Sequence, residues 1–545
     1  MEPFKLGINM AGAVSAGAYT AGVLDFLTEA LDEWYKAKSD GEAVPPHEIS
    51  IEVFSGASAG GMCAAISAAI TQEEFEHIHD PTKTGTTNKL YEAWVNKIDI
   101  HELLKTEDLK TGIISSLLDS TIIDTIARDA LSPGPPKTRQ YVSPHLTLFL
   151  TLTNLRGIPY ALFQDPELTP DEYVTYHADR LRFEMVDPGG TPRSPDARPL
   201  VRGGIGQMWD LLRTTAKATG AFPVFLASRI LDRARADYST PLWDSICPCG
   251  PAGAPILPSF PTGDGPWTTV YVDGGVTNNS PFTLAHDYLA TLNPPSAGCQ
   301  NERDAQSADR AVLTIAPFPG NEDFDKPYHA KSQSTLFSVM SNLLAALIAQ
   351  SRFFGESLAI VTAEPTFSRF FIAPSDDRNK GKAPLQCGLL GAFGGFFERG
   401  FRAHDFQLGR RNCQAFLDKH FILPETNPLF EGVSEAVRAA FKRPPLVAGL
   451  YPNVRWLPII PLCGSAQAPI PYPALAKISE KSLDEIVGLI SQRMKALLPP
   501  MLLGLKSGLL RFLIKWGVGA LMTIFGGKGE IKKYLEDALG EAVQK

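Results

Sequence analysis

The sequence predicts an α/β protein with a mostly parallel central sheet and helices on both of its faces. The first part of the chain reads as strand, glycine-containing loop, helix, strand, sharp turn and helix. Strands that alternate with helices pair in parallel, because each helix carries the chain back across one face of the sheet. Two later strand-like runs, at 268–272 and 311–317, extend this pattern.

The composition excludes several other classes of protein. Of the 545 residues, 44% are hydrophobic and 20% are charged, which is typical of an ordinary globular protein. The formal net charge of −8 argues against nucleic acid as the main partner. Among the seven cysteines only Cys247 and Cys249 form a close pair, without a second pair or nearby histidines. We therefore expect neither a disulfide framework nor a metal site, and a reducing compartment.

The first unit combines a strand at 5–9, a small-residue loop at 10–16 and a helix from about 17 to 34. The uncharged run 6–24 also resembles a secretory signal, but Asn9 and two glycines interrupt it. The loop would lie at the carboxyl end of its strand, the edge where active sites of α/β proteins form. Its backbone N–H groups could hold an oxyanion there, while a simple tight turn is the alternative.

A second stretch has the pattern of a nucleophile elbow, the strand-to-helix turn that exposes one serine hydroxyl. A strand-like run leads into Gly56-Ala57-Ser58-Ala59-Gly60, and small residues that suit a helix follow. The glycines let strand and helix pass closely, and a helix that begins at Ser58 directs its positive dipole end at the hydroxyl. Ser58 is therefore a candidate nucleophile, although such five-residue patterns also arise by chance.

A candidate acid follows a later strand. The run at 268–272 ends abruptly in Asp273-Gly274-Gly275, so Asp273 lies where a carboxylate can reach the end of another strand. The alternative is an ordinary turn, because Asp-Gly is a common turn dipeptide. Ser280 is expected to cap the next helix, with Pro281 as its first residue.

The C-terminal half contains an apolar run at 336–349 and a helix-like segment at 404–417 with Arg410 and Arg411. Such an arginine pair usually makes surface salt bridges and less often anchors a phosphate or headgroup. No acidic residue occurs from 486 to 529, where basic residues interrupt apolar runs. This pattern favours a helix that lies in a membrane interface over a helix buried against the core or an oligomer contact.

Taken together, these motifs resemble those of the patatin-like phospholipase family. Each motif is weak alone, but their order and their places on the strands make the set specific. The matching pieces, within about residues 5–320, are Gly17–Leu24, Gly56–Gly60, Leu152–Gly157, the Phe222-Pro223 turn and Asp273–Pro281.

The resemblance implies a three-layer fold and a serine–aspartate dyad without histidine. Ser58 would attack an acyl carbonyl, and Asp273 would accept its proton. The N–H groups of Gly12 and Ala13 would form the oxyanion hole. The usual substrates of the family are phospholipids, lysophospholipids and other acyl lipids, and no cofactor or metal is expected.

The loop Gly12-Ala13-Val14-Ser15-Ala16-Gly17 departs from the family pattern, which commonly has three glycines, any residue, a cation and a glycine. Here Ala13 and Val14 stand where the pattern has glycines, and Ala16 stands where it has a cation. The backbone N–H donors are still present. A non-catalytic lipid-binding protein of the same fold is therefore one alternative. The other is an α/β-hydrolase with a Ser–His–Asp triad, although its elbow would come early for that fold. The histidines that follow the acid are His286, His329, His404 and His420.

The predicted organisation has three parts. Residues 1–320 form the catalytic domain, with a surface insertion at about 160–268 that contains a helix near 206–218. Residues 321–485 form a helical extension packed on that domain, and 486–545 form a basic, apolar segment able to contact a membrane surface. We expect a lipid acyl hydrolase of the phospholipase A or lysophospholipase type, cytoplasmic or peripheral at the membrane.

Overall fold

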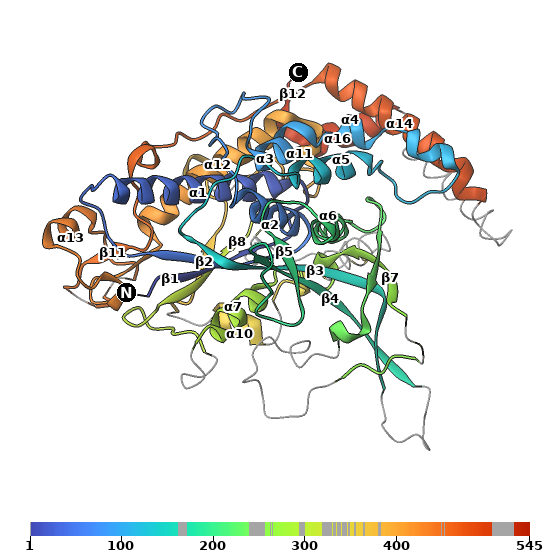
Figure 1. The fold of residues 1–545 in the computed structure, drawn as a ribbon. Helices are drawn as coiled ribbons and strands as arrows, with labels where there is room; N and C mark the ends of the chain where they lie inside the picture. Colours follow the sequence, from blue (N-terminus) through green and yellow to red (C-terminus); the bar gives the residue numbers. More distant parts are fainter. Residues whose placement is uncertain are drawn as a thin grey trace.

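A nine-stranded sheet occupies the centre of the molecule in the computed structural model (Figure 1). The structure describes residues 2–161, 172–238, 257–318 without 262, 264 and 294–299, parts of 330–362, and 366–544 without 380–382, 448, 452 and 504–527. The strands are β1 Phe4–Met10, β2 Ile49–Gly56, β3 Val142–Ala161, β4 Tyr173–Val186, β5 Ala197–Val201, β6 Arg229–Arg233, β7 Trp267–Asp273, β8 Arg310–Ile315 and β9 Arg369–Ile372.

The sheet is mostly parallel, as the sequence predicts. Its main path runs β5-β4-β3-β2-β1-β8-β9, while β7 pairs with both β3 and β6. The pairs β1–β2, β1–β8, β2–β3, β4–β5 and β8–β9 are parallel. The pairs that involve β7, and the pair β3–β4, are antiparallel. At one edge Met10 pairs with both Gly56 and Ile315, so the ends of β1, β2 and β8 lie together.

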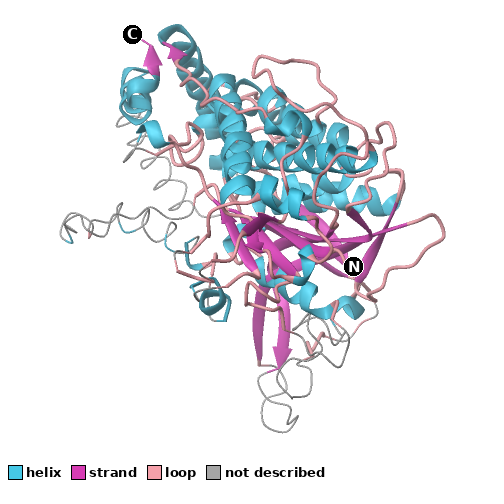
Figure 2. Ribbon diagram, turned by 90° about the vertical axis from the view of Figure 1, so that its left-hand side faces the viewer, coloured by secondary structure: helices cyan, strands magenta, loops and turns pink. Residues whose placement is uncertain are grey.

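Helices cover both faces of the sheet, which confirms the predicted α/β class. In Figure 1, α1, α2, α6 and α12 lie on one face, and α7 and α10 lie on the other. The view in Figure 2 shows that the first face carries most of the helices. The longer helices are α1 Gly17–Ser39, α2 Ser58–Ile70, α5 Thr121–Ala130, α6 Gln207–Thr219, α7 Phe282–Thr291, α12 Arg399–Lys419, α14 Glu480–Leu503 and α16 Lys528–Leu539. Shorter ones are α3 Lys89–Tyr91, α4 Ile100–Leu103, α10 Glu356–Thr362, α11 Gly394–Phe397 and α13 Glu435–Phe441.

The prediction that about 160–268 forms a surface insertion is wrong for three strands in this range. Strands β4, β5 and β6 belong to the central sheet. Alternating buried residues in β6 and the buried end of β4 pack into the core. The cluster Pro188-Gly189-Gly190 lies in the connection between β4 and β5. The helix expected near 206–218 is α6. Likewise, the stretch 321–485 is not purely helical, since its strand β9 extends the sheet beside β8.

Helices α1 and α12 pack closely, and this contact determines the role of Arg410. The Arg410 guanidinium is buried and pairs with Asp25 and, at 2.6 Å, with Glu29, both on α1. It therefore makes neither a surface salt bridge nor a headgroup site. Arg411 stacks on the ring of Tyr472 at 3.6 Å from the centroid.

Two other sequence expectations differ from the structure, and one lies outside its described part. Helix α7 begins after Pro281, and the Ser280 hydroxyl accepts a hydrogen bond from Asn9 instead of capping the helix. Most of the apolar run 336–349 lies outside the described residues.

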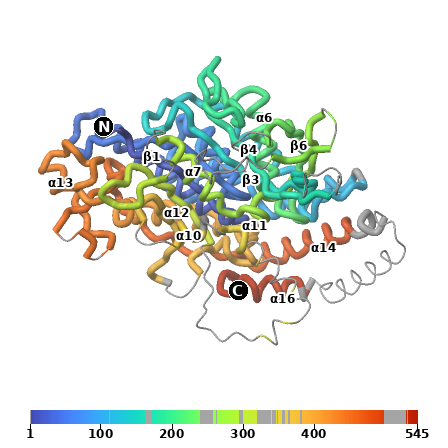
Figure 3. Tube along the Cα trace, turned by 90° about the horizontal axis from the view of Figure 1, so that it is seen from below, coloured from blue at the N-terminus to red at the C-terminus, as the bar shows by residue number. Residues whose placement is uncertain are grey.

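The C-terminal helices α14 and α16 lie side by side (Figure 3). Arg493 of α14 is buried and pairs with Asp108, so this basic residue faces protein. The central part of the basic segment, 504–527, lies outside the described residues. Within the described part of the chain, no helix combines the length and the apolar character needed to cross a bilayer.

Substituting Gly22 tests the α1–α12 contact. A Cβ at Gly22 would collide with the backbone carbonyl oxygen of Phe406 on α12. We expect Gly22→Ala to lower the free energy of unfolding by roughly 1–3 kcal/mol, because the backbones cannot separate without losing core contacts. Gly488→Ala is the matched control, since a Cβ there meets nothing within 4 Å. Thermal and urea unfolding of both variants would contradict the contact if Gly22→Ala were as stable as the control.

Candidate active site

Ser58 lies at the sharp turn between β2 and α2. Its φ of +53° is in the left-handed region, which is unusual for a residue other than glycine and common at functional turns. A Cβ at Gly56 would lie 2.6 Å from the carbonyl oxygen of Gly60, and one at Gly60 would collide with that of Met10. The two glycines therefore permit the close passage of strand and helix that the sequence predicts.

The structure brings Ser58 and Asp273 together although they are 215 positions apart. The hydroxyl of Ser58 donates a hydrogen bond of 2.6 Å to Oδ2 of Asp273. Strand β3 lies between their strands: Leu150 pairs with Gly56 of β2, and Leu152 pairs with Asp273 of β7. Strand β7 runs antiparallel to β3 and ends at Asp273, which therefore lies beside the elbow.

The environment of Asp273 favours a neutral carboxyl more than water does. Burial raises its pKa to about 7, and hydrogen bonds from the Ser58 hydroxyl and the Gly275 N–H partly offset this rise. The Gly275 N–H donates to Oδ1 at 2.7 Å, so each carboxyl oxygen has one donor. A carboxyl with a pKa near neutrality can both accept and return a proton under ordinary conditions.

Backbone contacts hold both residues in place. The Ser58 N–H donates to the Thr219 hydroxyl at 3.0 Å, which satisfies an otherwise free donor at the start of α2. The Thr153 hydroxyl donates to the carbonyl oxygen of Asp273 at 2.8 Å. Neither threonine is predicted from the sequence as a supporting residue. Thr153 lies in one of the family-like motifs, whereas Thr219 only precedes one, the Phe222-Pro223 turn.

The predicted oxyanion loop lies beside Ser58, but its two candidate donors differ. A Cβ at Gly12 would lie 3.1 Å from that of Ser58, which shows how closely the loop approaches. The N–H of Gly12 already donates to the carbonyl oxygen of Asn279 at 3.0 Å. Within the described residues, the N–H groups of Ala13 and Val14 have no acceptor. Val14 has a φ of +47°, so the backbone turns at this point.

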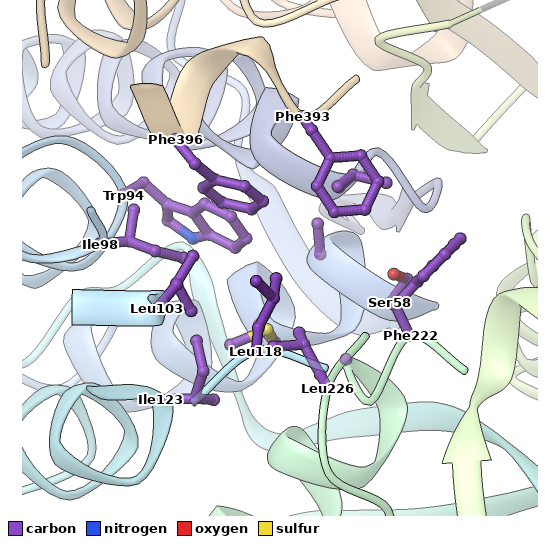
Figure 4. A pocket seen from close by; sticks show the side chains of 14 residues that line it. Ser58, Trp94, Ile98, Leu103, Leu118, Ile123, Phe222, Leu226, Phe393 and Phe396 are labelled. Atoms are coloured by element: carbon purple, nitrogen blue, oxygen red, sulfur yellow. The ribbon is translucent and has the colours of Figure 1, made fainter. Parts of the chain in front are cut away.

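An apolar pocket opens beside the Ser58 hydroxyl (Figure 4). It has an empty volume of ≈ 480 Å³, part of which is open to solvent. Apart from Ser58 its lining is hydrophobic or small, which suits an alkyl chain better than a polar group. The lining residues are Val14, Ser58, Ala59, Met62, Trp94, Ile98, Leu103, Leu118, Ile123, Gly220, Phe222, Leu226, Phe393 and Phe396.

The described histidines that a triad would use lie in other environments. His286 pairs with Asp287 and stacks on Phe282. His404 pairs with its neighbour Asp405 on α12, and His420 stacks on Phe416. His329 lies outside the described residues. Within the described residues, no histidine forms a hydrogen bond with the Ser58 side chain or the Asp273 carboxylate.

Comparisons with known proteins agree with this architecture. The family model for the patatin-like phospholipase matches residues 9–286. A protein of Sinorhizobium fredii (strain NBRC 101917 / NGR234), the uncharacterized protein y4iI, is 34% identical over 90% of this chain and 75% of its own length. The crystal structure of VipD from Legionella pneumophila is 11% identical, covers 100% of this chain and 89% of that chain, and has a TM-score of 0.20. The family match, which covers half of the chain, shows that the chain belongs to the patatin-like phospholipase family.

Proposed function

We propose that the protein hydrolyses acyl lipids through a Ser58–Asp273 dyad and an acyl-serine intermediate. The observation that carries this proposal is the 2.6 Å hydrogen bond to the buried Asp273 carboxyl from the Ser58 hydroxyl, whose residue lines an apolar pocket. Membership in the patatin-like phospholipase family supports a lipid substrate, of the phospholipid or lysophospholipid kind. The proposal requires no cofactor.

The first half of the reaction forms the acyl-serine. Ser58 Oγ attacks the carbonyl carbon of the lipid ester while its proton passes to Asp273 Oδ2. The negative charge that develops on the carbonyl oxygen is stabilised by the N–H groups of Ala13 and Val14 and by the N-terminal end of α2. When the tetrahedral intermediate collapses, the C–O bond to the alcohol breaks, and the alcohol leaves with the proton from Asp273.

The second half releases the fatty acid. Asp273 takes a proton from water as the water oxygen attacks the acyl carbon of the acyl-serine. A second tetrahedral intermediate then collapses, the bond to Ser58 breaks, and the serine recovers its proton from Asp273. Throughout, the acyl chain lies in the apolar pocket, where burial of each methylene contributes about 0.8 kcal/mol.

Replacing the two dyad residues tests the chemistry. We expect Ser58→Ala to abolish labelling by a fluorophosphonate and to lower kcat for a soluble ester by roughly 10³-fold or more. Asp273→Asn should lower kcat by roughly 10³–10⁴-fold, because the amide cannot accept the proton. Asp232→Asn, on the exposed side of β6, is the matched control.

Two results would contradict the dyad. Absence of fluorophosphonate labelling in folded wild-type protein would favour the non-catalytic lipid-binding protein. Loss of activity in His286→Gln, His329→Gln, His404→Gln or His420→Gln as large as that in Ser58→Ala, with folding intact, would favour the triad.

The raised pKa of Asp273 predicts a pH dependence for both activity and stability. The carboxylate must be ionised to act as a base, so kcat/KM for a soluble ester should rise with pH through a midpoint at about 7. The folded state binds this proton more tightly than the unfolded state, whose aspartate has a pKa near 3.8. The stabilisation is therefore complete below 3.8 and is lost as the pH rises towards about 7.

The neutral variant Asp273→Asn separates these two effects. Since asparagine carries no buried charge, its melting temperature relative to wild type should be higher at pH 8 than at pH 4, as differential scanning calorimetry can measure. A wild-type activity midpoint near pH 4, with no pH trend in the stability difference, would contradict the burial argument.

Peripheral membrane contact through the basic segment is a separate part of the proposal. Arg511 and Lys515 lie on one helical stripe of the sequence, in the part outside the described residues. R511E/K515E should weaken sedimentation with anionic vesicles, by roughly 1 kcal/mol per charge removed, and spare hydrolysis of a soluble ester. The matched control K36E/K442E makes the same charge change at exposed positions elsewhere. Equal vesicle binding by both double variants would contradict membrane contact by this segment.

A further inference from the structure

We propose that Ser15 is a positioning residue for the oxyanion hole and that a segment of the C-terminal half holds it in place. This bracing segment comprises residues 386–397 and lies outside the residues 9–286 that match the family model. The inference deepens the proposed function and rests on it. It assigns part of the active-site geometry to a region that the family motifs do not include.

Ser15 joins the oxyanion loop to the bracing segment through four hydrogen bonds, one of them a longer contact of 3.3 Å from its hydroxyl to the carbonyl oxygen of Cys387. Its hydroxyl donates to the carbonyl oxygen of Ala392 at 2.6 Å and accepts from the N–H of Gly395 at 3.1 Å. Its own N–H donates to the same Ala392 carbonyl at 3.2 Å. Ser15 is fully buried and directly follows Val14. Its position therefore controls the direction of the Ala13 and Val14 N–H groups.

The bracing segment is itself anchored to helix α12. The Asp405 carboxylate accepts hydrogen bonds from the N–H groups of Gln386 and Cys387, each at 2.9 Å. Near the other end, Arg402 donates to the carbonyl oxygen of Gly395 at 2.7 Å. Because α12 packs against α1, which follows the oxyanion loop, the segment is held at a fixed position relative to the loop.

The backbone of the segment is adapted to this contact. Leu390, Gly391 and Ala392 have φ values of +53°, +62° and +76°, and such strain in residues other than glycine persists only where the surroundings enforce it. This conformation presents the Ala392 carbonyl to Ser15. A Cβ at Gly395 would lie 2.6 Å from the Ser15 hydroxyl oxygen, so a glycine is needed there for the hydroxyl to enter.

The same segment also forms a wall of the apolar pocket. Phe393 and Phe396 line it together with Ser58, as Figure 4 shows. The alignment of the oxyanion donors and the width of the pocket therefore depend on one piece of chain. In this protein the loop lacks the extra glycines and the cation common in the family, and Ser15 provides a fixed point for it.

Ser15→Ala tests the positioning role. Loss of the hydroxyl removes three of the four hydrogen bonds and lets the Ala13 and Val14 donors shift. We expect kcat for a soluble ester to fall by roughly 10- to 100-fold, since small misplacements of reacting groups have effects of this size. KM should stay within about threefold, because a group that acts only in the transition state changes kcat. Ser67→Ala is the matched control, since the hydroxyl of this buried α2 serine makes no hydrogen bond within the described residues.

Gly395→Ala approaches the same contact from the other side. It leaves Ser15 unchanged but displaces its hydroxyl, so kcat should fall in the same way as in Ser15→Ala. If Ser15→Ala does not accumulate as folded protein, Gly395→Ala tests the positioning role of Ser15 in its place. Its kcat is then measured over a range of temperatures. Circular dichroism must show that each variant is folded at the assay temperature.

The outcomes distinguish this inference from the proposed function. If wild type neither hydrolyses esters nor reacts with a fluorophosphonate at Ser58, the proposed function fails, and the positioning role fails with it. If wild type is active while both variants keep kcat within about twofold and only melt earlier, Ser15 has a purely structural role and this inference alone is overturned. A similar loss of kcat in Ser67→Ala would also overturn it.

Discussion

The buried hydrogen bond between Ser58 and Asp273 is the interaction on which the site geometry depends. Removing a carboxylate from water costs several kcal/mol, and only two donors replace the lost hydration. The resulting pKa of about 7 makes the acid suitable as a base, but it also destabilises the folded state at high pH. The long strand β3 makes this contact possible, because its positions 150 and 152 align the ends of β2 and β7.

The sequence predicts the two dyad candidates because each carries a local signal. Gly56 and Gly60 mark a close crossing of strand and helix, and Asp273 follows a strand directly. It does not predict Thr219, whose contact with the Ser58 N–H depends on the position of α6 after more than a hundred residues of intervening chain. The hydrogen bond from the Gly12 N–H to Asn279 is equally long-range, which is why the proposed oxyanion donors are Ala13 and Val14 and not Gly12.

The wrong predictions about the rest of the fold have the same physical origin. Proline and glycine clusters mark the ends of β4 and β5. They do not indicate whether these strands pair with the central sheet, so the sequence of 160–268 is typical of a surface insertion. Arg410 is an example of the opposite error, in which a buried residue is predicted to be exposed. An arginine pair in a polar helix is typical of a solvent-exposed surface, yet Arg410 is buried because two carboxylates of α1 lie opposite it. Such long-range matches leave no pattern within one segment.

Arg493 connects the C-terminal segment with the pocket and determines how its role can be measured. Its guanidinium donates to the carbonyl oxygen of Leu117 at 2.6 Å and pairs with Asp108 at 2.7 Å, while the adjacent Leu118 lines the pocket. A deletion that includes Arg493 would leave the Asp108 carboxylate without this partner and loosen the pocket wall at Leu118. Removing one partner of a largely buried ion pair strongly destabilises the folded state. Such a deletion would therefore reduce ester hydrolysis and vesicle binding together, whatever the segment does at a membrane. Charge reversal beyond Arg493 leaves this anchor intact, so a selective loss of vesicle binding can then be attributed to the headgroup contact itself.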